Sequence, residues 1–301
     1  MATKYATLPD GTTYRVSKGD IPRSLRPTTG KRVITIVVLA IVLFYFLAPV
    51  VWLLISSTKS NADLITTKGW AFGANNIVAN YQALMGWTQG MFWRWVANSV
   101  FYSTVAGVVG TLLAVSAGYG LAKFRFPGQN AVQVIIMSGL LLPVALLTIP
   151  LYLVFHNLGL TNTVWAILIP SCVSPFGVFL GRVYAQSSVP DEIIESARID
   201  GAGEARTFFT IVLRLLAPAM VTIFLFIFVA TWNNFLLPLM MLSSVELKPV
   251  TLGLYGMMSY FNPQYGAVLQ GALLGVIPLV ILFLALQKQW QSGLAAGAVK
   301  G

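Results

Sequence analysis

Long runs of apolar residues, separated by short polar segments, dominate the pattern of this chain. A transmembrane α-helix needs about 20 predominantly apolar residues. Six runs satisfy this requirement, at residues 33–55, 97–122, 132–155, 163–181, 215–242 and 266–287. The pattern predicts an all-α, polytopic membrane protein with six transmembrane helices and with both termini on the same side of the bilayer.

The polar segments at the two ends divide the chain into three parts. Residues 1–32 form a basic N-terminal tail, residues 33–288 a six-span transmembrane domain, and residues 289–301 a C-terminal tail. The first apolar run is longer than the core of a signal peptide, so we expect an uncleaved span there.

Lysine and arginine are distributed unevenly between the two predicted sides. One side carries only four of the 19 basic residues, which are Lys59, Lys68, Arg94 and Lys248. The others lie in the N-terminal tail, in the second and fourth loops, and in the C-terminal tail. Because basic loops favour the cytoplasm, both termini are predicted to be cytoplasmic. The net charge of +10 then follows from topology, and no nucleic-acid partner is needed to explain it.

Composition excludes most catalytic proteins. Hydrophobic residues make up 57% of the chain and charged residues only 9%, whereas a soluble domain has about 25% charged residues. One cysteine and one histidine are too few for a cysteine or histidine metal site, and no P-loop is present. We therefore predict no catalytic residues, no metal site and no cofactor on this chain, with any energy source on another chain.

The apolar runs contain almost no ionisable residues. Asp, Glu, Lys and Arg are absent from their interiors, and only Arg214 stands at an edge. Ion-coupled secondary carriers usually place such groups near the bilayer midplane. The pattern therefore disfavours a secondary carrier or channel, which stays an alternative because backbone carbonyls can also bind Na⁺.

Acidic residues gather in the fourth loop, at about residues 188–214, which is predicted to face the cytoplasm. Ser188, followed three residues later by Asp191, predicts a capping box and a helix from Ser188 to Asp200. Gly201 is placed to end this helix, because glycine accepts the left-handed backbone that a sharp turn requires.

An apolar patch on this helix would consist of Ile193, Ile194 and Ala197, and a second helix is predicted from Glu204 toward Pro218. The organised loop favours a short helix that docks onto a cytoplasmic partner. A solvated connection between two spans is the alternative interpretation.

The fourth loop resembles the signature of permease subunits of binding-protein-dependent ABC importers. The matching residues are Glu195-Ser196-Ala197, Asp200-Gly201-Ala202, Phe208, Ile211 and Leu213. Two positions depart from the usual signature, since Ser196 replaces an alanine and Arg214 replaces a proline.

The chain from about residue 33 to its end is similar to the carbohydrate-importer branch of these permeases, the group of the smaller maltose permease subunit. The stretches that carry this resemblance are 121–128, 149–152, 159–163, 232–238 and 293–301. The resemblance implies the type I ABC importer permease fold and a location in the bacterial cytoplasmic (inner) membrane. A permease for a non-sugar solute, and a membrane scaffold that shares only the docking helix, stay open as alternatives.

The resemblance also implies a division of labour. This chain and a second permease subunit would form the pathway through the lipid bilayer. Two copies of an ATPase subunit would use ATP and Mg²⁺, and an extracytoplasmic sugar-binding protein would deliver the carbohydrate, a di- or oligosaccharide. The chain itself would not be an enzyme.

Three groups of site residues follow. By the resemblance, ATPase coupling falls to Glu195, Ser196, Ala197, Asp200, Gly201 and Ala202, and the C-terminal tail offers further contacts at Gly297, Lys300 and Gly301. Sugars are held by aromatic faces and by amides, and the fifth run supplies both at Trp232, Asn233 and Asn234. The alternative for these three is hydrogen bonding to the second permease subunit.

Overall fold

The computed structural model describes residues 5–7, 13–15, 29–258 and 264–298, and the chain divides into two compact units, residues 1–54 and 55–301. The first unit holds strands β1 (Tyr5–Thr7) and β2 (Thr13–Arg15), which pair antiparallel with Tyr5 opposite Arg15. Most of helix α1 (Thr29–Ser57) also belongs to this unit. The strand pair lies in the basic tail, where the sequence predicted no element.

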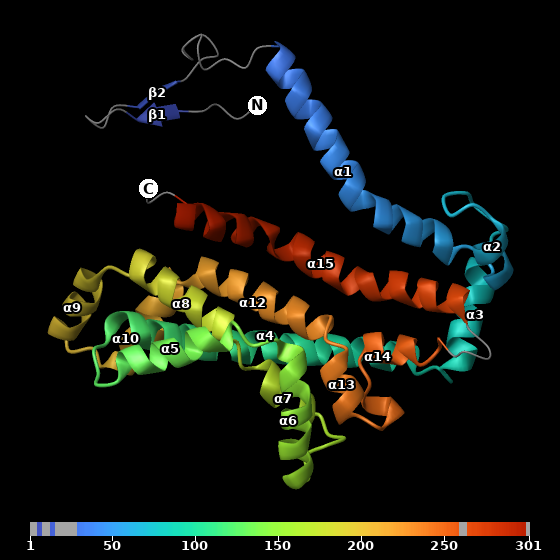
Figure 1. Cartoon of the computed structure of the whole chain (residues 1–301). Helices are drawn as coiled ribbons and strands as arrows, with labels where there is room; N and C mark the ends of the chain where they lie inside the picture. The colour runs from blue at the N-terminus through green and yellow to red at the C-terminus, as the bar shows by residue number, and fades with distance from the viewer. Residues whose placement is uncertain (1–4, 8–12, 16–28, 259–263, 299–301) are drawn as a thin grey trace. The chain divides into compact units, whose positions relative to one another are not determined.

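The secondary-structure elements among the described residues of the second unit are all helices (Figure 1). Its elements are α2 (Asn61–Thr66), α3 (Ile77–Trp87), α4 (Phe92–Lys123), α5 (Gln129–Gly139), α6 (Val144–Asn157), α7 (Trp165–Ser171), α8 (Pro175–Ser188), α9 (Asp191–Ile199), α10 (Glu204–Thr207), the π-helix η2 (Phe208–Val212), α11 (Leu213–Leu215), α12 (Ala217–Trp232), α13 (Leu236–Met241), the 3-10 helix η3 (Val245–Leu247), α14 (Val250–Tyr255) and α15 (Tyr265–Ala298).

Four segments in the described residues are long and apolar enough to cross a membrane as they stand: Thr29–Ser57, Phe92–Lys123, Trp165–Ser188 and Tyr265–Gln287. Two further helix pairs qualify together but are bent, by 105° between α5 and α6 and by 80° between Glu204–Leu215 and α12. The predicted number of six spans is reached if each bent pair is one span.

Three apolar runs are interrupted, against the expectation of one helix for each. The run at 163–181 divides between α7 and α8, at residues 172–174. The run at 132–155 breaks before Pro143, which takes an extended conformation (ψ 119°) at the start of α6. The run at 215–242 breaks after Trp232, and Asn234 Oδ1 accepts a hydrogen bond from Leu237 N at 3.3 Å. Proline and asparagine favour such breaks. The mean hydropathy of an apolar run does not reveal them.

The core is built around α4, which packs along α8 and α12. Glycines allow the backbones of α4 and α8 to approach each other closely. A Cβ added to Gly118 on α4 would lie 2.5 Å from the backbone nitrogen of Arg182 on α8. Around this contact, one cluster of buried side chains joins Tyr119 on α4, Ile194 on α9 and Phe208 on η2. The segment that carries α9 is thus fixed to the ends of the spans.

Large apolar side chains remain exposed on the surfaces of the spans. Ile135 on α5, Leu146 and Ile149 on α6, and Ile281 on α15 are all more than half exposed. Such extended apolar surfaces are covered by lipid or by another protein in a membrane-embedded helix bundle.

Candidate functional site

Helix α9 is the short helix that the fourth loop was expected to contain, but it begins later. Helix α8 continues through Ser188, so that residue ends one helix and does not cap the next. Pro190 stands at the N-cap of α9 without a side-chain capping bond, and the carboxylates of Asp191 and Glu192 occupy the first turn. The predicted capping box is therefore wrong. The acids stabilise this end through the helix dipole instead.

The end of α9 is the turn predicted at Gly201. The amide of Ala202 donates to the carbonyl of Ala197 at 2.9 Å, and the amide of Gly201 donates to the carbonyl of Arg198 at 3.0 Å. These are the two bonds of a Schellman motif, which places its left-handed residue directly after the C-cap. Gly201 has φ +78°, and a Cβ added to it would meet no atom within 4 Å. Backbone conformation, not crowding, is thus the reason for glycine here.

The inner face of α9 rests on the core. Ile194 and Ala197 are buried, and Ile194 belongs to the cluster that includes Tyr119 and Phe208. Ile193 points elsewhere and is 37% exposed, so only two members of the predicted apolar patch face inward. A displacement of α9 would therefore press on α4, α8, η2 and α12, which contribute most of the cluster.

The outer face of α9 and the following turn are open. Among the predicted coupling residues, Glu195, Ser196, Asp200 and Gly201 are exposed, Ala202 is half-buried and Ala197 is buried. The Ser196 hydroxyl donates to the Glu192 carbonyl at 2.8 Å, within the helix. Ile199, at the end of α9, is 86% exposed, which is unusual for an isoleucine. The arrangement suits a helix that presents one face to another chain.

Two ion pairs tie α9 to its neighbours. Lys123 Nζ, at the end of α4, lies 2.6 Å from Asp191 Oδ1, with 9% of the lysine side chain and 73% of the aspartate exposed. Arg198 Nε lies 2.7 Å from Glu204 Oε1 across the Gly201 turn, and both side chains are about half exposed. The hydrogen bond to Glu204 raises the pKa of the Arg198 guanidinium above its ordinary value.

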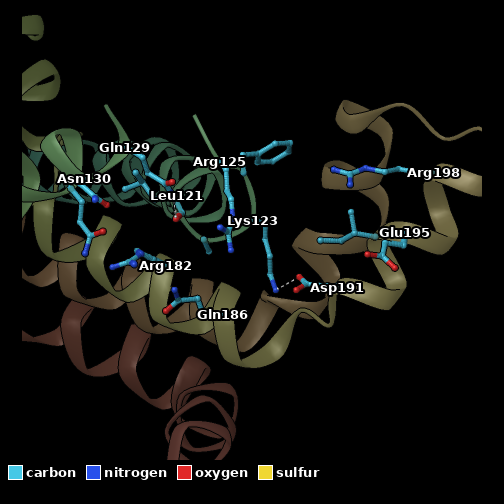
Figure 2. A pocket seen from close by; sticks show the side chains of 14 residues that line it. Leu121, Lys123, Arg125, Gln129, Asn130, Arg182, Gln186, Asp191, Glu195 and Arg198 are labelled. Carbon is cyan, nitrogen blue, oxygen red and sulfur yellow. Dashed lines mark hydrogen bonds and ion pairs between the residues drawn. The ribbon is translucent and has the colours of Figure 1, made fainter. Parts of the chain in front are cut away.

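A polar pocket of about 510 Å³ lies behind α9, between the end of α4, the following loop, α5 and α8 (Figure 2). Its lining includes Lys123, Arg125 and Arg182, together with Glu195 and Arg198 of α9. The sequence did not single out this pocket. The signal it offered was a set of polar residues at helical spacing near the ends of apolar runs.

The predicted substrate residues separate in the structure. Trp232 is 3% exposed and stacks on Phe228 with 5.9 Å between ring centroids, so most of its surface is packed in the core. Trp232 and exposed Asn233 both line an apolar cavity of about 450 Å³ between α12, α14 and α15, where Phe235 and Tyr255 add two further rings. Asn234 does not line this cavity, and its side chain accepts a hydrogen bond from Leu237 N in α13.

The remaining candidate site residues are those of the C-terminal tail and of a possible metal site. Gly297 lies in the last turn of α15, and Lys300 and Gly301 lie outside the described residues. Within the described residues, no three His, Cys, Asp or Glu side chains are grouped in a way that could hold a metal ion.

The pair Lys123–Asp191 is the contact of α9 that sequence reasoning missed. Its two residues are separated by 68 positions, and each has a sufficient local explanation: a lysine near the end of an apolar run and an acid at the start of a helix. Only the packing of α4 against α8 brings them together.

Comparisons with known proteins give consistent matches. Residues 110–294 match the family described as binding-protein-dependent transport system inner membrane component. The arabinooligosaccharides transport system permease protein AraQ of Halalkalibacterium halodurans is 35% identical over 212 residues, which are 70% of this chain and 76% of that protein. The lactose transport system permease protein LacG of Rhizobium radiobacter is 32% identical over 266 residues, which are 87% of this chain and 94% of that protein.

Solved structures agree on the fold. A chain from a bacterial ABC transporter involved in the import of the acidic polysaccharide alginate aligns with a TM-score of 0.74. The alignment covers 87% of this chain and 98% of that chain, at 23% sequence identity. The similarity establishes the type I permease fold that the sequence predicted.

Proposed function

Because the chain belongs to the family of inner membrane components of binding-protein-dependent transport systems, we propose that it is the permease subunit of an ATP-driven sugar importer. The named relatives support a di- or oligosaccharide as substrate, since they serve arabinooligosaccharide and lactose transport. A third relative, a melibiose/raffinose/stachyose import permease of Bacillus subtilis, is 30% identical over 91% of this chain. An importer for a non-sugar solute is the alternative.

The family implies a partner permease, an ATPase and a binding protein. We propose one further permease subunit, two copies of the ATPase subunit that use ATP and Mg²⁺, and an extracytoplasmic sugar-binding protein. The uneven distribution of lysine and arginine supports cytoplasmic termini. In this orientation α9 faces the ATPase chains.

The observation that carries the coupling role is the two-sided character of α9. Its outer face and the Gly201 turn are open to a partner, whereas Ile194 on its inner face is packed among α4, α8 and α12. A force applied to the exposed face is therefore passed to the spans. Coupling is proposed for Glu195, Ser196, Ala197, Asp200, Gly201 and Ala202, and weaker contacts for the C-terminal Gly297, Lys300 and Gly301.

We propose fewer residues for the substrate pathway than the sequence suggested. Asn233 is the best supported, because it is exposed and lines the cavity of about 450 Å³ together with the rings of Trp232 and Tyr255. Asn234 contributes indirectly, by holding the start of α13 through its bond to Leu237 N.

The substitution Gly201→Asp tests the coupling role. It places a side chain at φ +78°, where no neighbouring atom in this chain obstructs it, and it adds a charge on the proposed docking face. We expect uptake of labelled sugar to fall at least about tenfold, because the changed turn costs about 1 kcal/mol or more and alters the contact with the ATPase.

Gly203→Asp is the matched control. Gly203 has an ordinary φ of −69°, and a Cβ there also meets nothing within 4 Å. We expect uptake within about twofold of the unmodified protein, since the backbone needs no change. Co-purification of the ATPase shows whether each variant assembles. Normal uptake by an assembled Gly201→Asp complex would refute the coupling role.

A further inference from the structure

The polar pocket behind α9 is formed by five segments: the end of α4, the loop that follows it, α5, α8 and α9. Helix α5 contributes Gln129, Asn130 and Gln133, and α8 contributes Arg182 and Gln186. Residues at spacings of three or four share a helix face, so each helix presents a polar stripe to the same cavity. Polar stripes on membrane helices usually face water, a ligand or a partner helix.

Cations exceed acids in this pocket. Four basic side chains line it, Lys123, Arg125, Arg182 and Arg198, against the two acids Asp191 and Glu195. Lys123 and Arg198 each form an ion pair. Arg125 and Arg182 have none within the part of the chain that the structure describes, so their charges are not balanced locally.

Arg182 is the residue that points most directly to a ligand. It is half-buried, and its Nε atom is fully buried without a hydrogen-bond partner in the described residues. Because Nε is inaccessible, a ligand in the open pocket would reach this guanidinium through its two terminal nitrogen atoms. Figure 2 shows Arg182 and Gln186 on one side of the pocket, with Lys123 at the end of α4 and Arg125 on the following loop opposite them.

We propose that this pocket binds a phosphate-bearing anion, held by Arg182 and Arg125 with the surrounding amides as additional donors. A guanidinium matches the geometry of a phosphate and binds it through two parallel hydrogen bonds. The volume of about 510 Å³ admits either an anionic lipid headgroup or a soluble phosphorylated molecule. The occupant would link α8 to the loop after α4, next to the base of α9.

The test measures binding to the purified, complete transporter complex in two arms. In the first, equilibrium dialysis with radiolabelled inorganic phosphate gives an affinity and a stoichiometry. In the second, native mass spectrometry counts phosphatidylglycerol molecules retained after mixing with phosphatidylglycerol in non-ionic detergent. Phosphate sites on the ATPase contribute equally in every variant, so the differences between variants report on this pocket.

Three substitutions compare the proposed ligands of the anion with an arginine outside the pocket. Arg182→Gln and Arg125→Gln each remove one proposed ligand, and Arg125 is exposed on a loop, so its loss should leave the fold intact. Arg214→Gln removes an exposed arginine of α11 that does not line the pocket, and it serves as the control. We expect each pocket variant to bind either phosphate or phosphatidylglycerol at least about tenfold more weakly. The control should bind both as the unmodified protein does.

The two arms separate the sources of the anion. Loss of phosphate binding in the pocket variants would assign a soluble phosphorylated ligand, and loss of only phosphatidylglycerol would assign a lipid headgroup. If both pocket variants bind phosphate and lipid as the Arg214→Gln control does, the proposal is overturned. Neither readout requires sugar transport, so the result is independent of the proposed substrate.

Discussion

The two ends of the helical unit hold their connecting segments in different ways. At the end where α4 begins, side chains bind the backbone of the segment between α13 and α14: Trp95 donates to the Val245 carbonyl at 2.8 Å, and Tyr102 donates to the Leu247 carbonyl at 2.9 Å. At the end where α4 finishes, α9 is held by a buried isoleucine and two ion pairs.

The contrast indicates which end is suited to movement. Asn98 adds two more bonds to the first segment, to the carbonyls of Glu246 and Lys248, and Asn162 accepts from the amides of Ser243 and Ser244. Each such bond has a fixed direction and depends little on salt. Ion pairs near the surface are longer-ranged and screened, so they tolerate small shifts of α9 that directional bonds would resist.

The largest effect is expected from shortening the isoleucine on which α9 rests. Ile194→Ala removes a buried side chain from the cluster shared with α4, α8 and α12, and should destabilise the protein by about 3 kcal/mol. The measurement is the thermal unfolding of the purified chain in detergent, together with substrate-stimulated ATPase activity of the complex.

Ile199→Ala is the matched control for that change, because Ile199 lies on the same helix but is 86% exposed. Its unfolding should stay within about 0.5 kcal/mol of the unmodified protein, while contact with the ATPase weakens. Equal destabilisation by the two substitutions would contradict the two-sided description of α9.

A smaller effect is expected at the opposite end from Asn162→Ala. Asn162 adopts φ +56°, which asparagine tolerates better than alanine, and its side chain makes three hydrogen bonds to Ser243 and Ser244. The substitution should cost about 2 kcal/mol in thermal unfolding, with little dependence on salt. Asn157→Ala, at an exposed position at the end of α6, should have no measurable effect. If the effect of Asn162→Ala on unfolding depended strongly on salt, directional hydrogen bonds would not be what distinguishes this end from the α9 end.

The smallest effect is expected from the ion pair between Lys123 and Asp191. A double-mutant cycle with Lys123→Gln and Asp191→Asn should give a coupling energy of about 1 kcal/mol at low salt, reduced severalfold in about 1 M salt. The more exposed pair Arg198–Glu204 should give a smaller coupling energy. Salt-independent coupling would mean that Lys123 is held by burial and not by charge.

Much of the candidate site could be predicted from the sequence, because its signals are local. Gly201 ends α9 as expected, since the turn needs a left-handed backbone that only a few residue types favour. The family signature placed the proposed coupling residues on α9 and on the turn that follows it. The start of α9 was misplaced because Ser188 is a good cap in isolation, and nothing nearby in the sequence shows that α8 extends through it.

The sequence alone determined the all-helical membrane architecture, because bilayer thickness imposes a length of apolar helix that can be counted along the chain. Tertiary structure decided the bend between α11 and α12, the burial of Trp232, and the convergence of Arg125 and Arg182 on one pocket. These features depend on which helices pack together. That choice rests on contacts between residues far apart in the chain, such as Gly118 and Gly181, which no local pattern records.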